Sequence, residues 1–187
     1  QPLEIKWSAS LWIILLKNLL VASGRKFNLD EQKEFINDST NVQNTSFKSL
    51  EEIVSEVQPT ILIGTSTQPG AFNEQVVKTM STYTERPIIL PLSNPTKLAE
   101  AKAEDLLRWT NGKALIGTGI PVENIQYNGV EYQIGQANNA LMYPGLGLGL
   151  IASKAQRVNK DILSQASHAL GNLVDVDKPG APILPPI

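Results

Sequence analysis

The stretch Thr60-Ile61-Leu62-Ile63-Gly64-Thr65-Ser66-Thr67 is the part of this sequence that most clearly decides the fold. Its first four residues form a short run rich in β-branched apolar side chains, which is typical of a buried strand, and small polar residues end the run. A helical pattern precedes it from Ser49, where Glu52 completes a capping box, and another follows from Asn73. This order of helix, strand and helix predicts an α/β fold.

The alternation of apolar runs and helical patterns continues along the chain. We expect a second strand over Pro87–Leu92 and a third over Ala114–Ile116. Between them, Thr96 is predicted to cap a helix that reaches Trp109 and stops at Gly112. The repeated units predict a Rossmann-like fold, in which a mostly parallel sheet is flanked by helices.

The C-terminal part of the chain predicts a helical segment and then a proline-rich tail. Asn159 is expected to cap an amphipathic helix, and Lys178–Ile187 is expected to form an extended tail or a wrapping arm. The run Gly145-Leu146-Gly147-Leu148-Gly149 lacks the glycine spacing of a dinucleotide-binding fingerprint. We interpret it as close backbone packing where a helix begins, and Pro144 fits such a start.

The composition excludes several function classes. The 187 residues are 42% hydrophobic and 18% charged, which predicts a packed core. Sixteen basic and eighteen acidic residues give a net charge of −2 with no basic stripe, so nucleic acid is not an expected partner. The chain has no cysteine and His168 is its only histidine, which excludes disulfides, thiol nucleophiles and Cys/His zinc sites. A reducing, cytoplasmic setting fits this composition.

The N-terminal stretch contains the most apolar part of the chain. Because the chain starts at Gln1 and not at Met, we expect it to be processed or to be a fragment of a longer protein. Leu11–Ala22 is interrupted by Lys17 and Asn18 and is too short to span a bilayer. We therefore expect no membrane span there.

Each of the three predicted strands ends in small polar residues, namely Thr65-Ser66, Ser93-Asn94 and Thr118. Ligands of open parallel sheets bind outside the carboxyl ends of the strands, so these loops are expected to share one crevice. Small polar residues are also ordinary turn formers, but three loops in register favour ligand binding. The pair Asn138-Asn139 offers amide donors for a carboxylate or carboxamide, with turn formation as the equal alternative.

The remaining titratable residues are weak candidates for catalysis. His168 falls on the last predicted helix, where a satisfied or exposed helical residue is more common than a catalytic base. Glu100, Glu104 and Asp105 are expected on a solvated helix, and no acidic cluster has the spacing of metal ligands.

Five motifs, in this order and spacing, resemble the carboxyl-terminal NAD-binding domain of the malic enzymes. They are Pro59–Ser66, Arg86–Ile89 with Leu92–Thr96, Trp109–Gly112, Gly117–Gly119, and Gln136–Asn139 through Pro144–Gly147. The resemblance covers residues 47–187, and residues 1–46 are expected to be a divergent N-terminal segment of the same domain. Gly64–Gly70 and the tail Asp177–Pro186 look most like the malolactic enzymes of lactic acid bacteria.

The resemblance implies a reaction on L-malate that uses NAD and a divalent ion, Mn²⁺ or Mg²⁺. In the malolactic branch the products are L-lactate and CO2, and the cofactor is reduced and reoxidised without net change. In the malic branch the products are pyruvate, CO2 and NADH. The metal would polarise the carbonyl during decarboxylation. A nucleotide-binding module without catalytic activity is the other function class that stays open.

By the same resemblance, five residues are expected to bind the cofactor: Gly64, Thr65, Ser66, Asn94 and Asn138. Asn94 and Asn139 are expected to bind malate. The family's catalytic tyrosine and lysine, its acidic metal ligands and its first glycine-rich βαβ unit are expected upstream of this chain. The domain is therefore expected to be incomplete, with no catalytic residue or metal ligand assigned here, and inactive alone. The full-length enzyme is expected to be a homo-oligomer.

Overall fold

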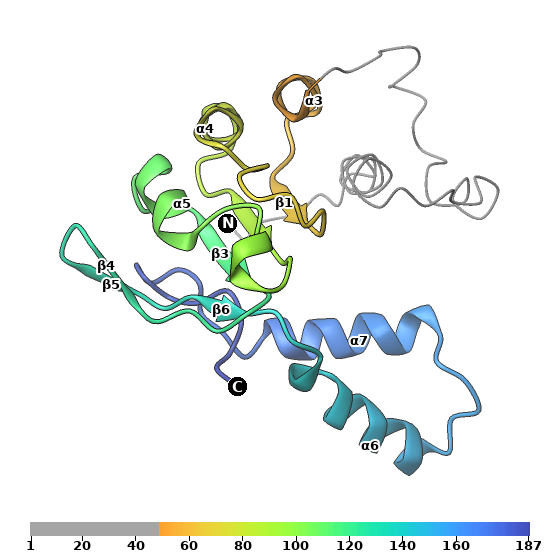
Figure 1. Cartoon of the computed structure of the whole chain (residues 1–187). Helices are drawn as coiled ribbons and strands as arrows, with labels where there is room; N and C mark the ends of the chain where they lie inside the picture. Colours follow the sequence, from red (N-terminus) through yellow and green to blue (C-terminus); the bar gives the residue numbers. More distant parts are fainter. Residues whose placement is uncertain (1–48) are drawn as a thin grey trace.

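The computed structural model describes residues 49–187 (Figure 1). The expectations for the segment 1–46, including the apolar stretch Leu11–Ala22, lie outside the described residues. The described part has the predicted α/β architecture, with a sheet, helices against it and a separate pair of helices near the C-terminus.

A four-stranded sheet with the order β1-β2-β3-β6 forms the centre of the fold, and every neighbouring pair is parallel. The strands are β1 (Ile61–Gly64), β2 (Ile88–Pro91), β3 (Leu115–Thr118) and β6 (Gly135–Gln136). The first three confirm the three predicted strands. Because α4 (Glu74–Tyr83) and α5 (Ala103–Trp109) connect them as crossovers, the strands run the same way and their carboxyl ends lie at one edge.

The predicted helix caps are present. In α3 (Leu50–Val57), Ser49 Oγ accepts a hydrogen bond from Glu52 N at 3.2 Å, and Glu52 Oε2 accepts one from Ser49 N at 3.1 Å. At the start of α4, Asn73 Oδ1 accepts from Val76 N at 3.0 Å. These bonds satisfy N–H groups that a helix start leaves without partners, so the predicted helix starts are confirmed.

The hydrophobic core lies between one face of the sheet and the helices α3, α4 and α5 (Figure 1). Leu62, Ile89 and Ile116 contribute to it from the three longer strands, at positions where alternate side chains face the helices. Its fully buried helical side chains are Val54 from α3, Val76, Val77 and Met80 from α4, and Leu106 and Leu107 from α5.

We expect Leu107→Ala to lower the free energy of unfolding by about 2–5 kcal/mol, because it removes buried methyl groups and leaves a cavity. Urea unfolding of the chain measures this change. The neighbouring residue Arg108 is exposed and forms a surface ion pair with Asp105 at 2.7 Å, so Arg108→Ala should cost less than about 1 kcal/mol. Equal losses in the free energy of unfolding for the two variants would contradict the placement of Leu107 in the core.

The predicted helix from Thr96 to Trp109 is wrong in its first half. Thr96–Leu98 form a 3₁₀ turn, η2, and the backbone is extended at Ala99 and again at Lys102 before α5 begins. Glu100, which we expected on a solvated helix, falls in this break and is 0% exposed. Hydrogen bonds to its carboxylate from two other loops outweigh the local helical pattern. The predicted stop at Gly112 is confirmed, since this glycine has a φ of 75°.

A β-hairpin that the sequence analysis did not predict lies between β3 and β6. It consists of β4 (Ile125–Tyr127) and β5 (Val130–Tyr132), which pair antiparallel. Asn128 and Gly129 form the two-residue turn with φ values of 50° and 77°. Positive φ at both positions is the conformation that an Asn-Gly pair favours in a tight hairpin.

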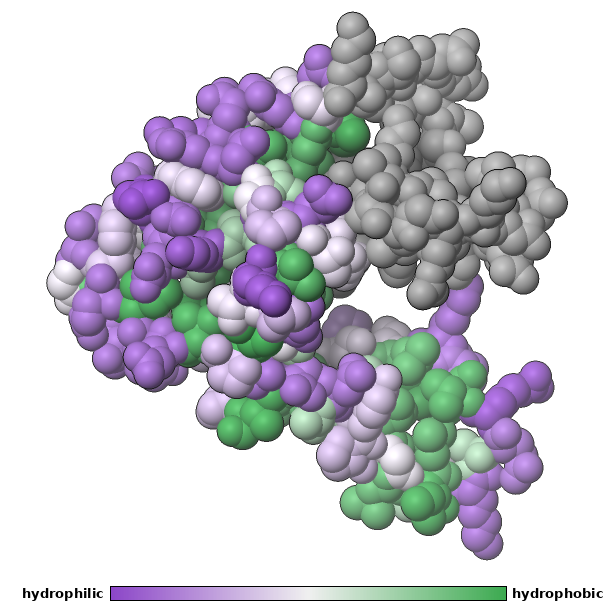
Figure 2. All heavy atoms as spheres, viewed as in Figure 1, coloured by the Kyte–Doolittle hydropathy of each residue, from purple (hydrophilic) through white to green (hydrophobic). Residues whose placement is uncertain are grey.

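The C-terminal helices α6 (Tyr143–Ser153) and α7 (Lys160–Gly171) lie beyond β6, on the opposite side of the sheet from α3 and α4 (Figure 1). Asn159 Oδ1 accepts from Ile162 N at 2.9 Å, which confirms the predicted cap of α7. Apolar side chains gather over these two helices in Figure 2. No described helix is long and apolar enough to cross a membrane.

The glycines of α6 do not show the close packing that we expected there. Apart from the backbone of α6 itself and the adjoining residues, no atom of the described residues lies within 4 Å of the position that a Cβ would take at Gly145, Gly147 or Gly149. The helix start itself is confirmed, with Pro144 in the first turn.

The proline-rich tail returns to the sheet and forms the predicted wrapping arm. Arg86 Nη2 donates to the Val176 carbonyl, and Gln133 N donates to the Gly180 carbonyl at 2.9 Å. Further along, Ile183 and Leu184 lie against glycines of β3 and β6, so the arm covers part of the sheet face opposite the helices.

We expect Gly180→Ala to release the arm. Gly180 has a φ of 76°, and a Cβ there would collide with the Glu131 carbonyl oxygen. The Gln133 amide should then exchange hydrogen about tenfold faster, which corresponds to about 1.4 kcal/mol of local stability. Gly70→Ala is the matched control, because Gly70 has the same φ of 76° and, apart from its chain neighbours, no residue of the described part of the chain lies within 4 Å of an added Cβ. Exchange that is equally fast in both variants would contradict the collision.

Candidate functional site

The carboxyl ends of the parallel strands bring the predicted polar loops to one edge of the sheet. Leu92 N donates to Gly64 O at 2.9 Å, which joins the ends of β1 and β2. Ala137 N donates to Thr118 O at 2.8 Å, which joins the ends of β3 and β6. The structure therefore groups the three loops that the sequence predicted and adds the segment leading to Asn138-Asn139 as a fourth.

A buried carboxylate, Glu100, connects two of these loops. Its Oε1 accepts from Ser66 N at 2.7 Å, from Ser66 Oγ at 2.9 Å and from Ser93 Oγ at 2.5 Å. Its Oε2 lies 3.4 Å from Ser93 N, which donates to it. The Phe72 amide also donates to the main-chain carbonyl of Glu100 at 3.1 Å. The bonds from Ser66 and Ser93 to the carboxylate are charge-assisted, as a carboxylate inside a protein requires.

Two predicted cofactor residues lie against Glu100. Ser66 is 5% exposed and its hydroxyl donates to the carboxylate, so this side chain faces the interior. Gly64 is buried, and a Cβ there would lie 2.6 Å from Glu100 Cδ. The absence of a side chain at Gly64 therefore makes room for Glu100. Nothing in the local sequence distinguishes Glu100 from the exposed Glu104, which is why the sequence analysis missed it.

Five polar residues at this edge are exposed: Thr65, Thr67, Asn94, Asn138 and Asn139. Thr118, by contrast, is 5% exposed, and its Oγ1 donates to the Ile120 carbonyl at 2.8 Å. The Asn94 side chain lies against the loop that follows β3, since its Oδ1 is 2.8 Å from the position of a Cβ on Gly119. Asn138 Oδ1 accepts from Ala140 N at 2.9 Å and caps the 3₁₀ turn η3 (Asn139–Leu141). Asn138 thus forms a turn, whereas the Asn139 side chain has no hydrogen-bond partner among residues 49–187.

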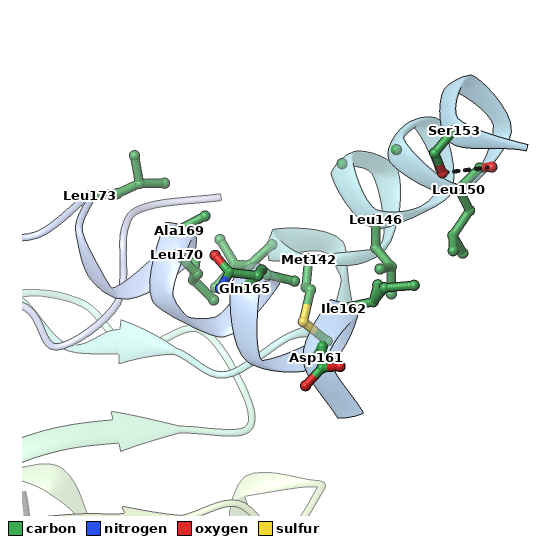
Figure 3. A pocket seen from close by; sticks show the side chains of 14 residues that line it. Met142, Leu146, Leu150, Ser153, Asp161, Ile162, Gln165, Ala169, Leu170 and Leu173 are labelled. Atoms are coloured by element: carbon green, nitrogen blue, oxygen red, sulfur yellow. Dashed lines mark hydrogen bonds between the residues drawn. The ribbon is translucent and has the colours of Figure 1, made fainter. Parts of the chain in front are cut away.

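A cavity of the described structure lies away from this edge. It lies between α6 and α7, has a volume of about 680 Å³ and is lined mostly by apolar side chains. Leu146 of α6 and Ile162 of α7 meet in this space (Figure 3). None of the predicted site residues lines it. The strand edge, by which we mean the edge of the sheet at the carboxyl ends of its strands, and this apolar cavity are therefore separate features.

The described residues do not provide a metal centre by themselves. Residues 49–187 contain no group of three or more His, Cys, Asp or Glu side chains that could hold a metal ion. The carboxylate of Glu100 is occupied by serine donors, and Asp105 pairs with Arg108 at 2.7 Å. His168 is exposed on α7, as expected.

Comparison with known proteins identifies the family. The profile described as "Malic enzyme, NAD binding domain" matches residues 4–187. The chain belongs to the malic enzyme family. This match confirms the resemblance and the Rossmann-like fold class, and it extends further toward the N-terminus than the motifs that carried the resemblance.

Individual malic enzyme family members support the same assignment. The chain is 60% identical over 157 residues to the malolactic enzyme of Lactiplantibacillus plantarum, which covers 83% of this chain and 29% of that protein. It is 60% identical over 156 residues to the malolactic enzyme of Leuconostoc mesenteroides, covering 83% and 28%. It is 54% identical over 136 residues to NAD-dependent malic enzyme 3 of Bacillus subtilis, covering 73% and 24%. The chain thus spans less than a third of the length of these curated relatives.

As a malic enzyme NAD-binding domain, the chain places its polar loops where this architecture binds ligands. In open α/β sheets the ligand crevice lies outside the carboxyl ends of the strands. The described edge has exposed hydroxyl and amide side chains there, with a close backbone approach at Gly119. This donor and acceptor set is chemically suited to the ribose and carboxamide groups of a dinucleotide.

Proposed function

We propose that the chain is the cofactor-binding portion of a malolactic enzyme, which decarboxylates L-malate to L-lactate and CO2 with NAD and Mn²⁺ or Mg²⁺. The observation that carries this proposal is the 60% identity to two malolactic enzymes over 83% of the chain. The NAD-dependent malic enzyme of Bacillus subtilis is 54% identical, and that of Acinetobacter baylyi is 44% identical.

The strand edge supports distinct roles for its exposed residues. Thr65 and Asn94 follow neighbouring strands and are exposed, so they can donate hydrogen bonds to NAD laid across the edge. Gly64 and Ser66 contribute to the proposed cofactor site by shaping the loop that carries Thr65, because Gly64 leaves room for Glu100 and Ser66 donates to its carboxylate. When bound, NAD supplies a hydride acceptor that returns the hydride later in the malolactic reaction. The protein's task at this edge is to hold and orient the two ligands.

Asn139 and Asn94 are the proposed malate contacts, and Asn138 is a further proposed cofactor contact. The Asn139 amide can donate to a malate carboxylate because no described residue occupies it. Asn138 uses its Oδ1 to cap η3, which leaves its amide nitrogen for the cofactor carboxamide.

We further propose that the catalytic tyrosine and lysine and the acidic metal ligands belong to other parts of the protein. The described residues do not form a metal site, so we assign no step through a metal to them. The whole enzyme is proposed to act in the cytoplasm as a homo-oligomer, without nucleic acid or membrane partners.

Product analysis of the full-length enzyme tests the proposal. Incubated with L-malate, NAD and Mn²⁺, it should form lactate with no net NADH. Formation of pyruvate with equimolar NADH would support the second candidate, an NAD-dependent malic enzyme, which the 54% identity to the Bacillus subtilis enzyme favours as the alternative. Neither product, in a protein that still binds NAD, would indicate a nucleotide-binding module without catalytic activity.

A further inference from the structure

Glu100 is the one fully buried acidic side chain among the described residues. It lies between η2 and α5, on neither a strand nor a helix. No Lys, Arg or His side chain of residues 49–187 forms an ion pair with it. A carboxylate without a counter-ion is costly to bury unless hydrogen bonds compensate it. The hydrogen-bond donors around Glu100 therefore show which segments of the chain hold this carboxylate in place.

The four donors that the described part of the chain supplies to this carboxylate come from the loops that follow β1 and β2. Ser66 supplies its amide and its hydroxyl, and Ser93 supplies the same two groups. Ser93 Oγ also accepts from Thr67 N at 2.9 Å. Glu100 therefore connects the two loops directly and, through the Ser93 hydroxyl, also holds the Thr67 backbone.

The residues next to these serines are among those exposed at the carboxyl-terminal edge of the sheet. Ser66 and Ser93 are each 5% exposed and turn toward Glu100. Their neighbours Thr65, Thr67 and Asn94 are exposed. Hydrogen bonds to the buried Glu100 carboxylate hold both serines in place. The distance between the exposed residues of the two loops therefore depends on this carboxylate.

We propose that Glu100 is a positioning residue for the cofactor site. It touches no ligand, and it sets the distance between the β1 loop and the β2 loop so that Thr65 and Asn94 reach NAD together. This inference rests on the proposed binding of NAD at the strand edge. Groups that hold a ligand need supporting hydrogen bonds of this kind to keep their geometry.

The test uses the full-length enzyme with Glu100→Gln and, as a matched control, Glu104→Gln. Glutamine has the size of glutamate, but its amide nitrogen cannot accept hydrogen bonds, so at least one serine donor loses its partner. Glu104 is exposed and lies four residues away on α5, so its variant changes the charge equally without touching the loops. The dissociation constant for NAD is measured by calorimetric titration well below the melting temperature of each variant.

We expect Glu100→Gln to raise the dissociation constant for NAD by about tenfold or more, since small displacements of binding groups have large effects. Glu104→Gln should leave it within about twofold. A role confined to stability would lower the melting temperature of Glu100→Gln and leave the NAD affinity of the folded protein unchanged. That result would overturn the proposal.

A second variant decides the question if Glu100→Gln does not fold. Ser93→Ala removes the hydroxyl between Glu100 and Thr67 N but leaves the Ser66 contacts in place. It should weaken NAD binding by a smaller factor of about threefold or more, and unchanged affinity would overturn the proposal. If the parent enzyme itself binds no NAD, the proposed function fails. If the parent enzyme binds NAD and the variants bind it with unchanged affinity, only the proposed role of Glu100 is refuted.

Discussion

The 187-residue chain, expressed alone, is expected to form neither lactate nor pyruvate from L-malate. Under the proposed function, the proton-transferring residues and the metal ligands come from parts of the protein other than residues 49–187. The described residues place exposed polar side chains at the carboxyl-terminal edge of the sheet but form no group of three or more His, Cys, Asp or Glu side chains that could hold a metal ion. Proton transfer and metal coordination make the main catalytic contributions to decarboxylation, and the binding and orientation of ligands do not replace them.

An assay with L-malate, NAD and Mn²⁺ measures this, with the full-length enzyme as the positive control and host extract without the chain as the background. Product formation above the background would contradict the assignment of catalysis to other parts of the protein. Asn139→Ala in the same chain separates true turnover from contaminating host enzyme, since a contaminant would not respond to the substitution.

Asn139→Ala in the full-length enzyme is expected to lower kcat/KM for malate roughly tenfold to over a hundredfold. The physical reason is the loss of a hydrogen bond to a charged group, which costs about 1.5 to 3 kcal/mol. Asn139 is exposed at the strand edge, and its side chain has no hydrogen-bond partner among the described residues. Removing it should therefore change stability little, and affinity for NAD should change less than malate kinetics.

Melting temperature, NAD affinity and malate kinetics are measured on this variant and on Asn124→Ala, an exposed asparagine that precedes β4. The control should behave like the parent in all three. If Asn139 only shapes the turn before α6, its loss should lower the melting temperature and weaken both ligands equally. Unchanged malate kinetics would remove Asn139 from the site.

The correct predictions concern structures that short segments of sequence specify. The helix caps at Ser49, Asn73 and Asn159 depend on hydrogen bonds between residues three positions apart. The hairpin at Asn128-Gly129, which was not predicted, is likewise specified by a short segment, because an Asn-Gly pair favours a tight hairpin turn. The polar loops at the strand ends were predictable for a similar reason, because a parallel sheet always places these ends at one edge.

The error over the helix from Thr96 concerns Glu100, whose environment is supplied by other segments of the chain. Local spacing predicted one helix from Thr96 to Trp109, and four donors from Ser66 and Ser93 interrupt it at Glu100. The Ser66 donors come from 34 positions away and the Ser93 donors from 7 positions away. The spacing of neighbouring residues does not indicate such hydrogen bonds, so the sequence around a buried glutamate resembles the sequence around a solvated one.

By itself, the sequence determined the α/β class, the family, the helix starts and which loops form the strand edge. The helix starts and the α/β class follow from capping and periodicity, which act over short distances along the chain, and the family follows from the order of motifs that can be read directly from the sequence. Only the tertiary structure decided which side chains of those loops face solvent. Ser66 turns inward and Thr65 outward because a carboxylate buried beneath the loop needs hydrogen-bond donors, and the fold brings it there.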